Sequence, residues 1–236
     1  MEKLIAGASE LGVELGPEQV DSIRLYHREL VEWNARVNLT SVTDWREARE
    51  KHFLDSLTVS LALTDDMLDR GSFIDVGTGA GFPGMPLKIA FPSLRATLVD
   101  STAKKTAFLD RLVKKLGLCV AIRTGRAETL AHDSELRGSF DFVLARALGS
   151  MAVLAELTLP FCRLGGLVVA QKAHGLDDEL KQAEDAVGLM GGRVQDVIEV
   201  PGTQVTGTRR LAVLRKSGPT PDAYPRRPGI PKKRPL

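Results

Sequence analysis

Residues 73–81 read Phe73-Ile-Asp-Val-Gly-Thr-Gly-Ala-Gly81, a short apolar run that ends in a loop with glycine at every second position. A chain that turns tightly after a buried strand, and lets a ligand approach its backbone closely, needs residues without a Cβ atom. Free N–H groups at the start of a following helix would then lie near the ligand. The stretch therefore predicts a β-strand that leads into a cofactor-binding loop.

The loop by itself fits two classes of cofactor. Residues 79–84, Gly-Ala-Gly-Phe-Pro-Gly, match the Gly-x-Gly-x-x-Gly pattern of dinucleotide-binding proteins. However, Asp75 at the strand end would repel a pyrophosphate, whereas it suits a cofactor that carries an ammonium and a sulfonium. Pro83 and Pro86 also remove N–H donors where a dinucleotide would bind its phosphates. We therefore expect S-adenosylmethionine as the cofactor, with an NAD-dependent dehydrogenase as the alternative.

Two more acidic residues follow later strands. Asp100 ends the second predicted strand, where a carboxylate accepts hydrogen bonds from ribose hydroxyls; a helix cap is the alternative. Glu128 follows the third strand, so it is expected near the exocyclic amine of adenine. A solvent-exposed glutamate in the first turn of a helix is an equally good interpretation of Glu128.

From residue 72 onward, short apolar runs alternate with helical stretches. The predicted strands are 72–76, 95–100, 119–124, 140–145, 166–171, 194–199 and 210–215, and the predicted helices are 84–90, 103–116, 127–132, 150–162 and 176–190. This alternation indicates an α/β fold with a parallel sheet and right-handed crossovers. The segment 201–209 is too short for a crossover helix, so the last strand should run antiparallel. A Rossmann-like sheet of seven strands with the last one reversed is the class I S-adenosylmethionine methyltransferase fold.

The two ends of the chain differ from this middle part. Residues 1–65 predict an N-terminal helical cap, because apolar residues recur at three- and four-residue steps after Gly16-Pro17 and Asp44 resembles a helix cap. Residues 66–216 form the predicted methyltransferase domain. Residues 217–236 hold six of the twelve prolines, which predicts an extended, partly disordered basic tail.

Composition narrows the class of protein. A hydrophobic content of 43% suffices for one core, and two cysteines give no disulfide framework. The spacing of the histidines fits no zinc site, no apolar run is long enough to span a membrane, and the N-terminus lacks the shape of a signal peptide. We expect a cytoplasmic monomer without metal. The basic tail suggests a polyanionic partner, with a merely solubilising role as the alternative.

A series of short motifs resembles one family. The motifs, in order, are Asn38-Leu-Thr-Ser41, Lys51-His-Phe-Leu-Asp-Ser56, the loop Asp75 to Gly84, Asp100-Ser101, Lys104-Lys105, Phe108-Leu109, Arg126-Ala-Glu128, Phe140-Asp141 and Arg146-Ala147. Together they resemble the glucose-inhibited division protein B family, the 16S rRNA guanine-N7 methyltransferases, over roughly residues 15–235. Ala145 and Leu148 stand where members often have serine and phenylalanine, and Lys172-Ala173 replaces a Lys-Gly pair.

This resemblance implies a substrate and a cofactor site. The implied substrate is a guanine in the decoding-region loop of 16S ribosomal RNA, presented as RNA or as the small ribosomal subunit. The resemblance implies S-adenosylmethionine contacts at Gly77, Phe82, Asp100, Ser101, Thr102, Ala127, Glu128 and Arg146. The acid and the other two glycines of the loop, Asp75, Gly79 and Gly81, complete the expected cofactor site.

The chemistry of guanine N7 fits a site without a general base. N7 carries a lone pair and no proton, so the protein must mainly hold it in line with the methyl carbon, about 3–3.5 Å away. The fourth strand carries no Asp-Pro-Pro-Tyr-like string for amino-group methylation, and no Pro-Cys pair suggests a cysteine nucleophile. His52 and Asp55, three residues apart on one helix face, are expected to make structural hydrogen bonds.

Because attack makes the guanine cationic, basic residues are assigned to base orientation and phosphate contact. Arg146 and Lys172 are the candidates for orienting the base, and a structural salt bridge is the alternative for Arg146. The predicted RNA-binding residues are Lys104, Lys105, Arg126, Lys172 and Arg209. A non-catalytic RNA-binding or ribosome-assembly factor that keeps the fold is the remaining alternative.

Overall fold

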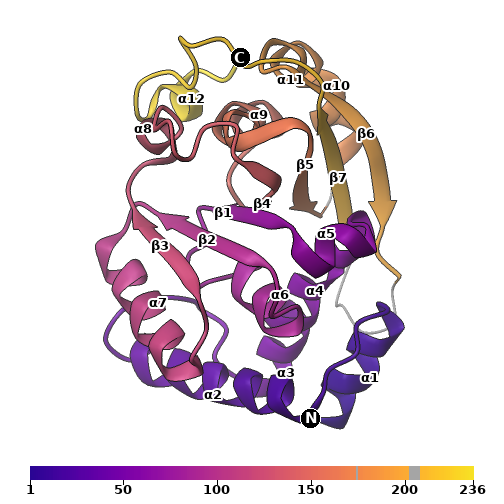
Figure 1. Cartoon of the computed structure of the whole chain (residues 1–236), viewed down its shortest axis with the longest axis vertical. Coiled ribbons are helices and arrows are strands. Elements are labelled where there is room, and N and C mark those ends of the chain that lie inside the picture. The colour runs from indigo at the N-terminus through magenta and orange to yellow at the C-terminus, as the bar shows by residue number, and fades with distance from the viewer. Residues whose placement is uncertain (174, 202–207) are drawn as a thin grey trace.

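The computed structural model describes residues 1–173, 175–201 and 208–236, and its centre is one seven-stranded sheet (Figure 1). The strands are β1 (Ser72–Val76), β2 (Arg95–Asp100), β3 (Val120–Thr124), β4 (Phe140–Arg146), β5 (Cys162–Lys172), β6 (Gly192–Glu199) and β7 (Arg210–Lys216). Their order is β3-β2-β1-β4-β5-β7-β6, and only β7 runs antiparallel to its neighbours. The predicted class I methyltransferase sheet with a reversed last strand is therefore confirmed.

The predicted strands agree closely with the observed ones, with one exception. β5 begins at Cys162 rather than at residue 166, because Cys162 pairs with Phe140 of β4 ahead of an irregularity between Phe140 and Phe142. This extension carries exposed residues such as Leu164, which is 61% exposed, so it lacks the apolar pattern of a buried strand.

The helices of the sheet domain begin at, or within one residue of, their predicted starts and end earlier in several cases. They are α6 (Gly84–Ala90), α7 (Ala103–Leu116), α8 (Ala127–Leu130), α9 (Met151–Thr158), α10 (Leu176–Gln182) and α11 (Glu184–Leu189). The predicted helix 150–162 passes after Thr158 into a 3₁₀ turn that contains Pro160. The predicted helix 176–190 is divided at Ala183 into two short helices.

The N-terminal segment is helical, as predicted. It contains α1 (Glu2–Glu10), α2 (Pro17–Asn34), α3 (Trp45–Ala48), a π-helical turn (Arg49–Leu54), α4 (Asp55–Leu57), a 3₁₀ turn (Thr58–Ala62) and α5 (Asp65–Arg70). Asp44 caps α3, since its carboxylate accepts hydrogen bonds from the backbone N–H groups of Arg46 and Glu47 at 2.9 and 3.2 Å.

The sheet has a buried core on each face. Alternate residues of a strand point to opposite faces, so Phe73 of β1 enters one apolar cluster while Ile74 and Val76 enter the other. The first cluster is completed by α1, α2, α4, α6 and α7, and the second by α9, α10 and α11. The N-terminal helices are thus part of the core and help to cover one face of the sheet (Figure 1).

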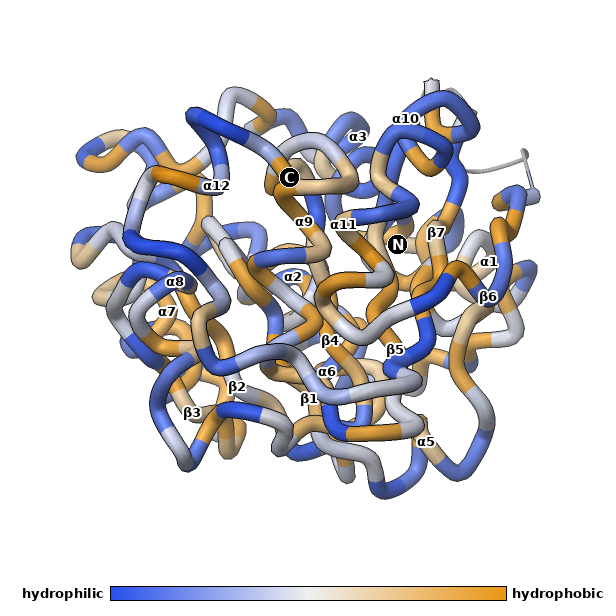
Figure 2. The backbone as a smooth tube through the Cα atoms, turned by 90° about the horizontal axis from the view of Figure 1, so that it is seen from above, coloured by the Kyte–Doolittle hydropathy of each residue, from blue (hydrophilic) through white to orange (hydrophobic). Residues whose placement is uncertain are grey.

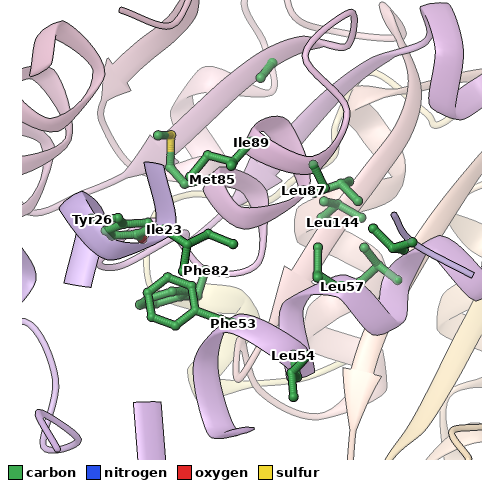
Figure 3. Close-up of a cluster of buried hydrophobic side chains, with 14 of the residues drawn as sticks. Ile23, Tyr26, Phe53, Leu54, Leu57, Phe82, Met85, Leu87, Ile89 and Leu144 are labelled. Atoms are coloured by element: carbon green, nitrogen blue, oxygen red, sulfur yellow. The ribbon is translucent and has the colours of Figure 1, made fainter. Parts of the chain in front are cut away.

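Tyr26 of the N-terminal segment anchors the glycine loop. The Tyr26 hydroxyl donates a hydrogen bond to the carbonyl oxygen of Ala80 at 2.5 Å, and burial raises the pKa of this phenol well above its usual value. The Tyr26 ring stacks on Phe82 at 5.2 Å, with Phe53 edge-on to both rings (Figure 3). The aromatic side chains of α2 and the π-helical turn therefore support the loop by packing against Phe82.

The prediction of an extended, partly disordered tail is wrong. Residues 217–236 fold back beside α8 and α9 and end in a short helix, α12 (Ile230–Lys233), as Figure 1 shows in yellow. Arg226 makes an ion pair with Glu156 of α9, which is fully buried and needs a cation. Arg137 donates hydrogen bonds to the carbonyls of Thr220 and Tyr224 at 3.0 and 2.9 Å, which satisfies part of the tail backbone.

Within these described ranges, no helix combines the length and apolar character needed to cross a bilayer.

Replacing Tyr26 by phenylalanine should lower the free energy of unfolding by about 1–2 kcal/mol, because the buried Ala80 carbonyl loses its donor. Urea unfolding followed by circular dichroism measures the change. Tyr224→Phe is the matched control, since the Tyr224 hydroxyl makes no hydrogen bond to any described residue. Equal stability of the two variants would contradict the role given to the Tyr26 hydroxyl.

Candidate functional site

Three adjoining cavities lie at the carboxyl ends of the parallel strands, where α/β proteins bind ligands. The carboxylate cavity, of about 190 Å³, is lined by Gly77, Asp100, Ser101, Arg126, Ala127, Glu128, Leu148 and Lys232, among others. The loop cavity, of about 170 Å³, is lined by Thr40, His52, Gly77–Ala80, Phe82, Arg146 and Ala147. The basic cavity, of about 460 Å³, is lined by Lys51, His52, Asp55, Arg146, Ala147, Gln171, Lys172, Ala173 and Arg209.

The cavities form a continuous row because neighbours share wall residues. Gly77 lines both the carboxylate and the loop cavity. His52, Arg146 and Ala147 line both the loop and the basic cavity. A ligand in the first cavity can therefore reach a second ligand in the third across the glycine loop.

The glycines of the loop have different tasks. Gly77 has φ +72°, a conformation that favours glycine, and a Cβ there would require Leu148 Cδ1, 2.8 Å away, to shift. Gly79 has φ +62° and open space where its side chain would be, which leaves room for a ligand. Gly81 instead faces Tyr26 and Met85 and lines none of the three cavities. Gly81, which was expected to contact the cofactor, therefore serves the packing of the loop against Tyr26 and Met85.

Asp75 lies fully buried beneath the loop. Its Oδ2 accepts hydrogen bonds from the Thr78 hydroxyl at 2.6 Å and the Gly84 N–H at 2.9 Å. Its Oδ1 is buried without a partner among the described residues. Burial raises the pKa of Asp75 to about 6. The unsatisfied carboxylate oxygen is a feature that a cationic ligand above the loop would stabilise.

The start of α6 has few free backbone N–H donors for a pyrophosphate. The Gly84 N–H is taken by Asp75, and the Met85 N–H donates to the Gly81 carbonyl at 2.7 Å. Pro83 and Pro86 have no N–H to give. The loop therefore fits the S-adenosylmethionine prediction better than the dinucleotide alternative.

Asp100 is 6% exposed and fixed by backbone donors. Its Oδ2 accepts from the Gly79 N–H at 3.0 Å and its Oδ1 from the Thr102 N–H at 2.8 Å, so it also organises the start of α7. The remaining lone pairs face a cavity that Ser101 also lines, whereas Thr102 is exposed and lies outside it.

Glu128 is 5% exposed, so the interpretation as a solvent-exposed glutamate is wrong. Its Oε1 accepts hydrogen bonds from the Gly229 N–H at 2.8 Å and Arg126 Nη2 at 3.2 Å. With Asp100, it gives the carboxylate cavity two acceptors, which suit the hydroxyls and the amine of adenosine as donors. The residues present thus fit the expected cofactor.

Asp55 joins the two arginines of the basic cavity. It is buried, and its carboxylate oxygens accept from Arg146 Nη1 at 2.9 Å and Arg209 Nε at 2.8 Å. The Arg146 guanidinium also lies 5.3 Å from the centre of the Phe82 ring. The salt-bridge interpretation of Arg146 is therefore confirmed. Because Arg146 also lines two cavities, its role in orienting the base stays a prediction. The sequence carries no sign of these pairs, whose members lie 91 and 154 residues apart.

His52 is neutral and lines two of the cavities, although the sequence predicts only structural hydrogen bonds for it. Burial and the nearby Arg146 lower its pKa to about 4. Its Nδ1–H donates to the Lys51 carbonyl at 3.0 Å, which leaves Nε2 to accept from the Thr40 hydroxyl at 2.8 Å. The ring stacks on Phe82 at 4.5 Å. Its hydrogen bonds are structural, as predicted, although its partner is Thr40 and it lines the site.

The predicted RNA-binding residues fall into two groups. Lys172 and Arg209 line the basic cavity, and Lys172 Nζ is held by Glu179 at 2.6 Å and the Gly149 carbonyl at 2.7 Å. Arg126 and Lys105 lie beside the acids of the carboxylate cavity, with Lys105 Nζ 3.8 Å from Asp100. Lys104 is exposed on α7 and lines none of the three cavities.

Comparison with known proteins gives one consistent result. The model of the GidB family, described as rRNA small subunit methyltransferase G, matches residues 19–206. Proteins named ribosomal RNA small subunit methyltransferase G are 46% identical in Dehalococcoides mccartyi and 45% identical in Roseiflexus castenholzii, over the whole of both chains. The Bacillus subtilis protein of that name is 39% identical over all of this chain and 98% of its own.

Solved structures agree on the fold. A sarcosine dimethylglycine methyltransferase of Galdieria sulphuraria superposes with a TM-score of 0.55 at 13% identity, covering 69% of this chain and 84% of that one. The antibiotic-resistance methyltransferase Kmr gives a TM-score of 0.51 at 19% identity, covering 70% and 94%.

Replacing Asp75 by asparagine should flatten the pH dependence of stability in the ligand-free protein. The folded carboxyl keeps its proton up to a pKa of about 6, against 3.8 for the ordinary group, so its contribution is present at low pH and lost as pH rises through that window. Asp75→Asn should therefore match the wild type near pH 4 and exceed it by about 1–3 kcal/mol at pH 7.

Urea unfolding at several pH values measures this difference. Asp110→Asn is the control, because Asp110 is exposed and makes no ion pair or hydrogen bond with the described residues. A difference between Asp75→Asn and wild type that stays constant with pH would show that the buried carboxyl does not titrate as described.

Proposed function

The chain belongs to the rRNA small subunit methyltransferase G family, and on that basis we propose that it transfers a methyl group from S-adenosylmethionine to N7 of a guanine in the decoding-region loop of 16S ribosomal RNA. The observation that carries this proposal is the row of three cavities with shared walls. Acidic acceptors lie at one end of the row and paired cations at the other. The glycine loop separates them by the width of one small cavity.

The carboxylate cavity would hold the adenosine of the cofactor. Asp100 accepts from ribose hydroxyls and Glu128 from the adenine amine, while Ser101 and Ala127 form the walls. Gly79, whose side-chain position is open space, lets the methionine part cross the loop without meeting a side chain. The charged carboxylate of Asp75 beneath the loop favours the cationic groups of the cofactor.

When bound, S-adenosylmethionine supplies an electrophilic methyl group on its sulfonium. The residues of the loop cavity hold the two reactants in line, which is the main requirement for attack by a lone pair. His52 Nε2 is occupied by the Thr40 hydroxyl, so this histidine is not poised as a general base. That arrangement suits guanine N7, which has no proton to remove.

Paired charges in the basic cavity suit a base that becomes cationic. Asp55 offsets one of the two positive charges of Arg146 and Arg209, and Glu179 offsets that of Lys172. The neutral His52 adds no charge at pH 7. These side chains can thus orient a guanine or its phosphates without strongly opposing the methylated product.

The proposed roles follow from this arrangement. Arg146 orients the target base at the junction of the loop and basic cavities, and Lys172 shapes the basic cavity. Lys104, Lys105, Arg126 and Arg209 contact phosphates of the RNA. The protein acts as a cytoplasmic monomer without a metal, on 16S ribosomal RNA or on the small subunit.

The product identifies the function. The protein, labelled S-adenosylmethionine and unmodified 16S ribosomal RNA or small subunits should yield 7-methylguanosine in the RNA, measured by mass spectrometry of nucleosides. A different methylated nucleoside would contradict the N7 assignment. RNA binding without any methyl transfer would favour a non-catalytic assembly factor.

Arg209→Gln should raise KM for the RNA substrate about tenfold, because one cation that lines the basic cavity is lost. Affinity for S-adenosylhomocysteine should stay unchanged, since Arg209 is not part of the carboxylate cavity. Arg210→Gln is the matched control, because the adjacent Arg210 pairs with Asp177 and lines none of the three cavities. An equal KM change in both variants would remove Arg209 from the RNA site.

A further inference from the structure

The C-terminal tail forms one wall of the carboxylate cavity. Lys232 of α12 lines this cavity together with Asp100, Ser101 and Glu128. α12 contacts α9, whose Val153 and Leu157 line the same cavity. Figure 2 shows the mostly hydrophilic tail running alongside α8 and α9, with the C-terminus beside α9.

One backbone group of the tail touches the acid of this cavity directly. The Gly229 N–H donates to Glu128 Oε1 at 2.8 Å, and Arg126 donates to the same oxygen at 3.2 Å. Glu128 Oε2 has no hydrogen-bond partner among the described residues. The carboxylate is thus fixed through one oxygen, and the other oxygen is left for a ligand.

Glycine suits this contact. Gly229 has φ +83°, a conformation that residues with a side chain rarely adopt, and it precedes the first turn of α12. The left-handed backbone ends the extended part of the tail and turns the Gly229 N–H toward α8.

Buried contacts hold the tail in this position without a ligand. Glu156, fully buried on α9, accepts from the Arg226 backbone N–H at 2.8 Å and from its guanidinium at 2.7 and 2.9 Å. His132 Nε2 donates to the Pro225 carbonyl at 2.9 Å. These contacts lie a few residues before Gly229, so they place its N–H with little freedom.

We propose that the C-terminal tail is part of the cofactor site, where the Gly229 N–H orients Glu128 so that Oε2 reads the exocyclic amine of adenine. This inference rests on the proposed function and adds a specificity role for the tail. An adenine amine donates to the free carboxylate oxygen. A base with a carbonyl at the same position presents a second acceptor, which the oriented carboxylate repels.

The test compares two probes that differ at that position, S-adenosylhomocysteine and S-inosylhomocysteine, by calorimetry. The full-length protein should bind the adenosyl ligand at least about tenfold more tightly. A chain that ends at Pro228 keeps Arg226 for Glu156 but lacks Gly229 and α12. Its preference should fall to about threefold or less, mainly through weaker binding of the adenosyl ligand.

A second variant keeps the whole chain. Gly229→Pro has no N–H and cannot adopt φ +83°, so it removes the same hydrogen bond. It should show the same loss of preference, together with a higher KM for S-adenosylmethionine and a kcat near that of wild type. Lys233→Ala is the control, since Lys233 belongs to α12 but does not line the cavity.

A preference retained in both variants would overturn the inference, and so would an equal loss in Lys233→Ala. A general loss of stability would weaken both ligands and leave their ratio unchanged, which would also overturn it. Failure of the full-length protein to bind either ligand would instead contradict the proposed methyltransferase function.

Discussion

The shape of the glycine loop depends on one buried carboxylate. Asp75 Oδ2 accepts from Thr78 near the start of the loop and from Gly84 at its end, so a single side chain ties the two together. This arrangement takes up the N–H of Gly84 at the start of α6 and leaves a buried negative charge beneath the loop. Both consequences disfavour a phosphate and favour a cationic ligand. The preference for a cationic cofactor therefore depends on the Asp75 carboxylate that supports the loop as much as on the glycines of the loop.

The N-terminal helices complete what the sheet begins. Tyr26 and Phe53 pack beneath Phe82, so the loop is held from the side opposite its ligand (Figure 3). The same segment carries His52 and Asp55 to the ends of β4 and β7, where Asp55 joins Arg146 and Arg209. The sheet alone would present two unpaired arginines at this edge. The basic cavity thus exists because the helical segment docks there.

The sequence predicts well the elements whose pattern lies within one short segment of the chain. The strands of the sheet read as buried apolar runs, and Asp44 and Gly16-Pro17 mark helix starts through their own capping chemistry. The carboxylates Asp100 and Glu128 could be expected at one site, because each follows a strand parallel to the strand that ends in the glycine loop, and both line the carboxylate cavity. Gly81 could not be separated from Gly77 and Gly79, since the difference between them is the presence of Tyr26, which lies far away in the chain. The Asp55 ion pairs have no local signal either, because each joins residues from distant elements.

The prediction for the tail fails because its composition is compatible with more than one structure. Prolines and basic residues suggested a free, extended segment with affinity for polyanions, but proline-rich backbone can also be ordered if other groups satisfy its carbonyls, as Arg137 does. A signal for the folded tail was present in α9, where Glu156 is the lone acid among apolar residues. A carboxylate buried in such a helix requires a cation, and the charge of Arg226 is neutralised there. The exposed Arg227, Lys232, Lys233 and Arg234 are then the tail cations still able to meet RNA, beside or in the wall of the carboxylate cavity. Cofactor and RNA binding would in that case share one structural element, which the buried ion pair with Glu156 keeps in place.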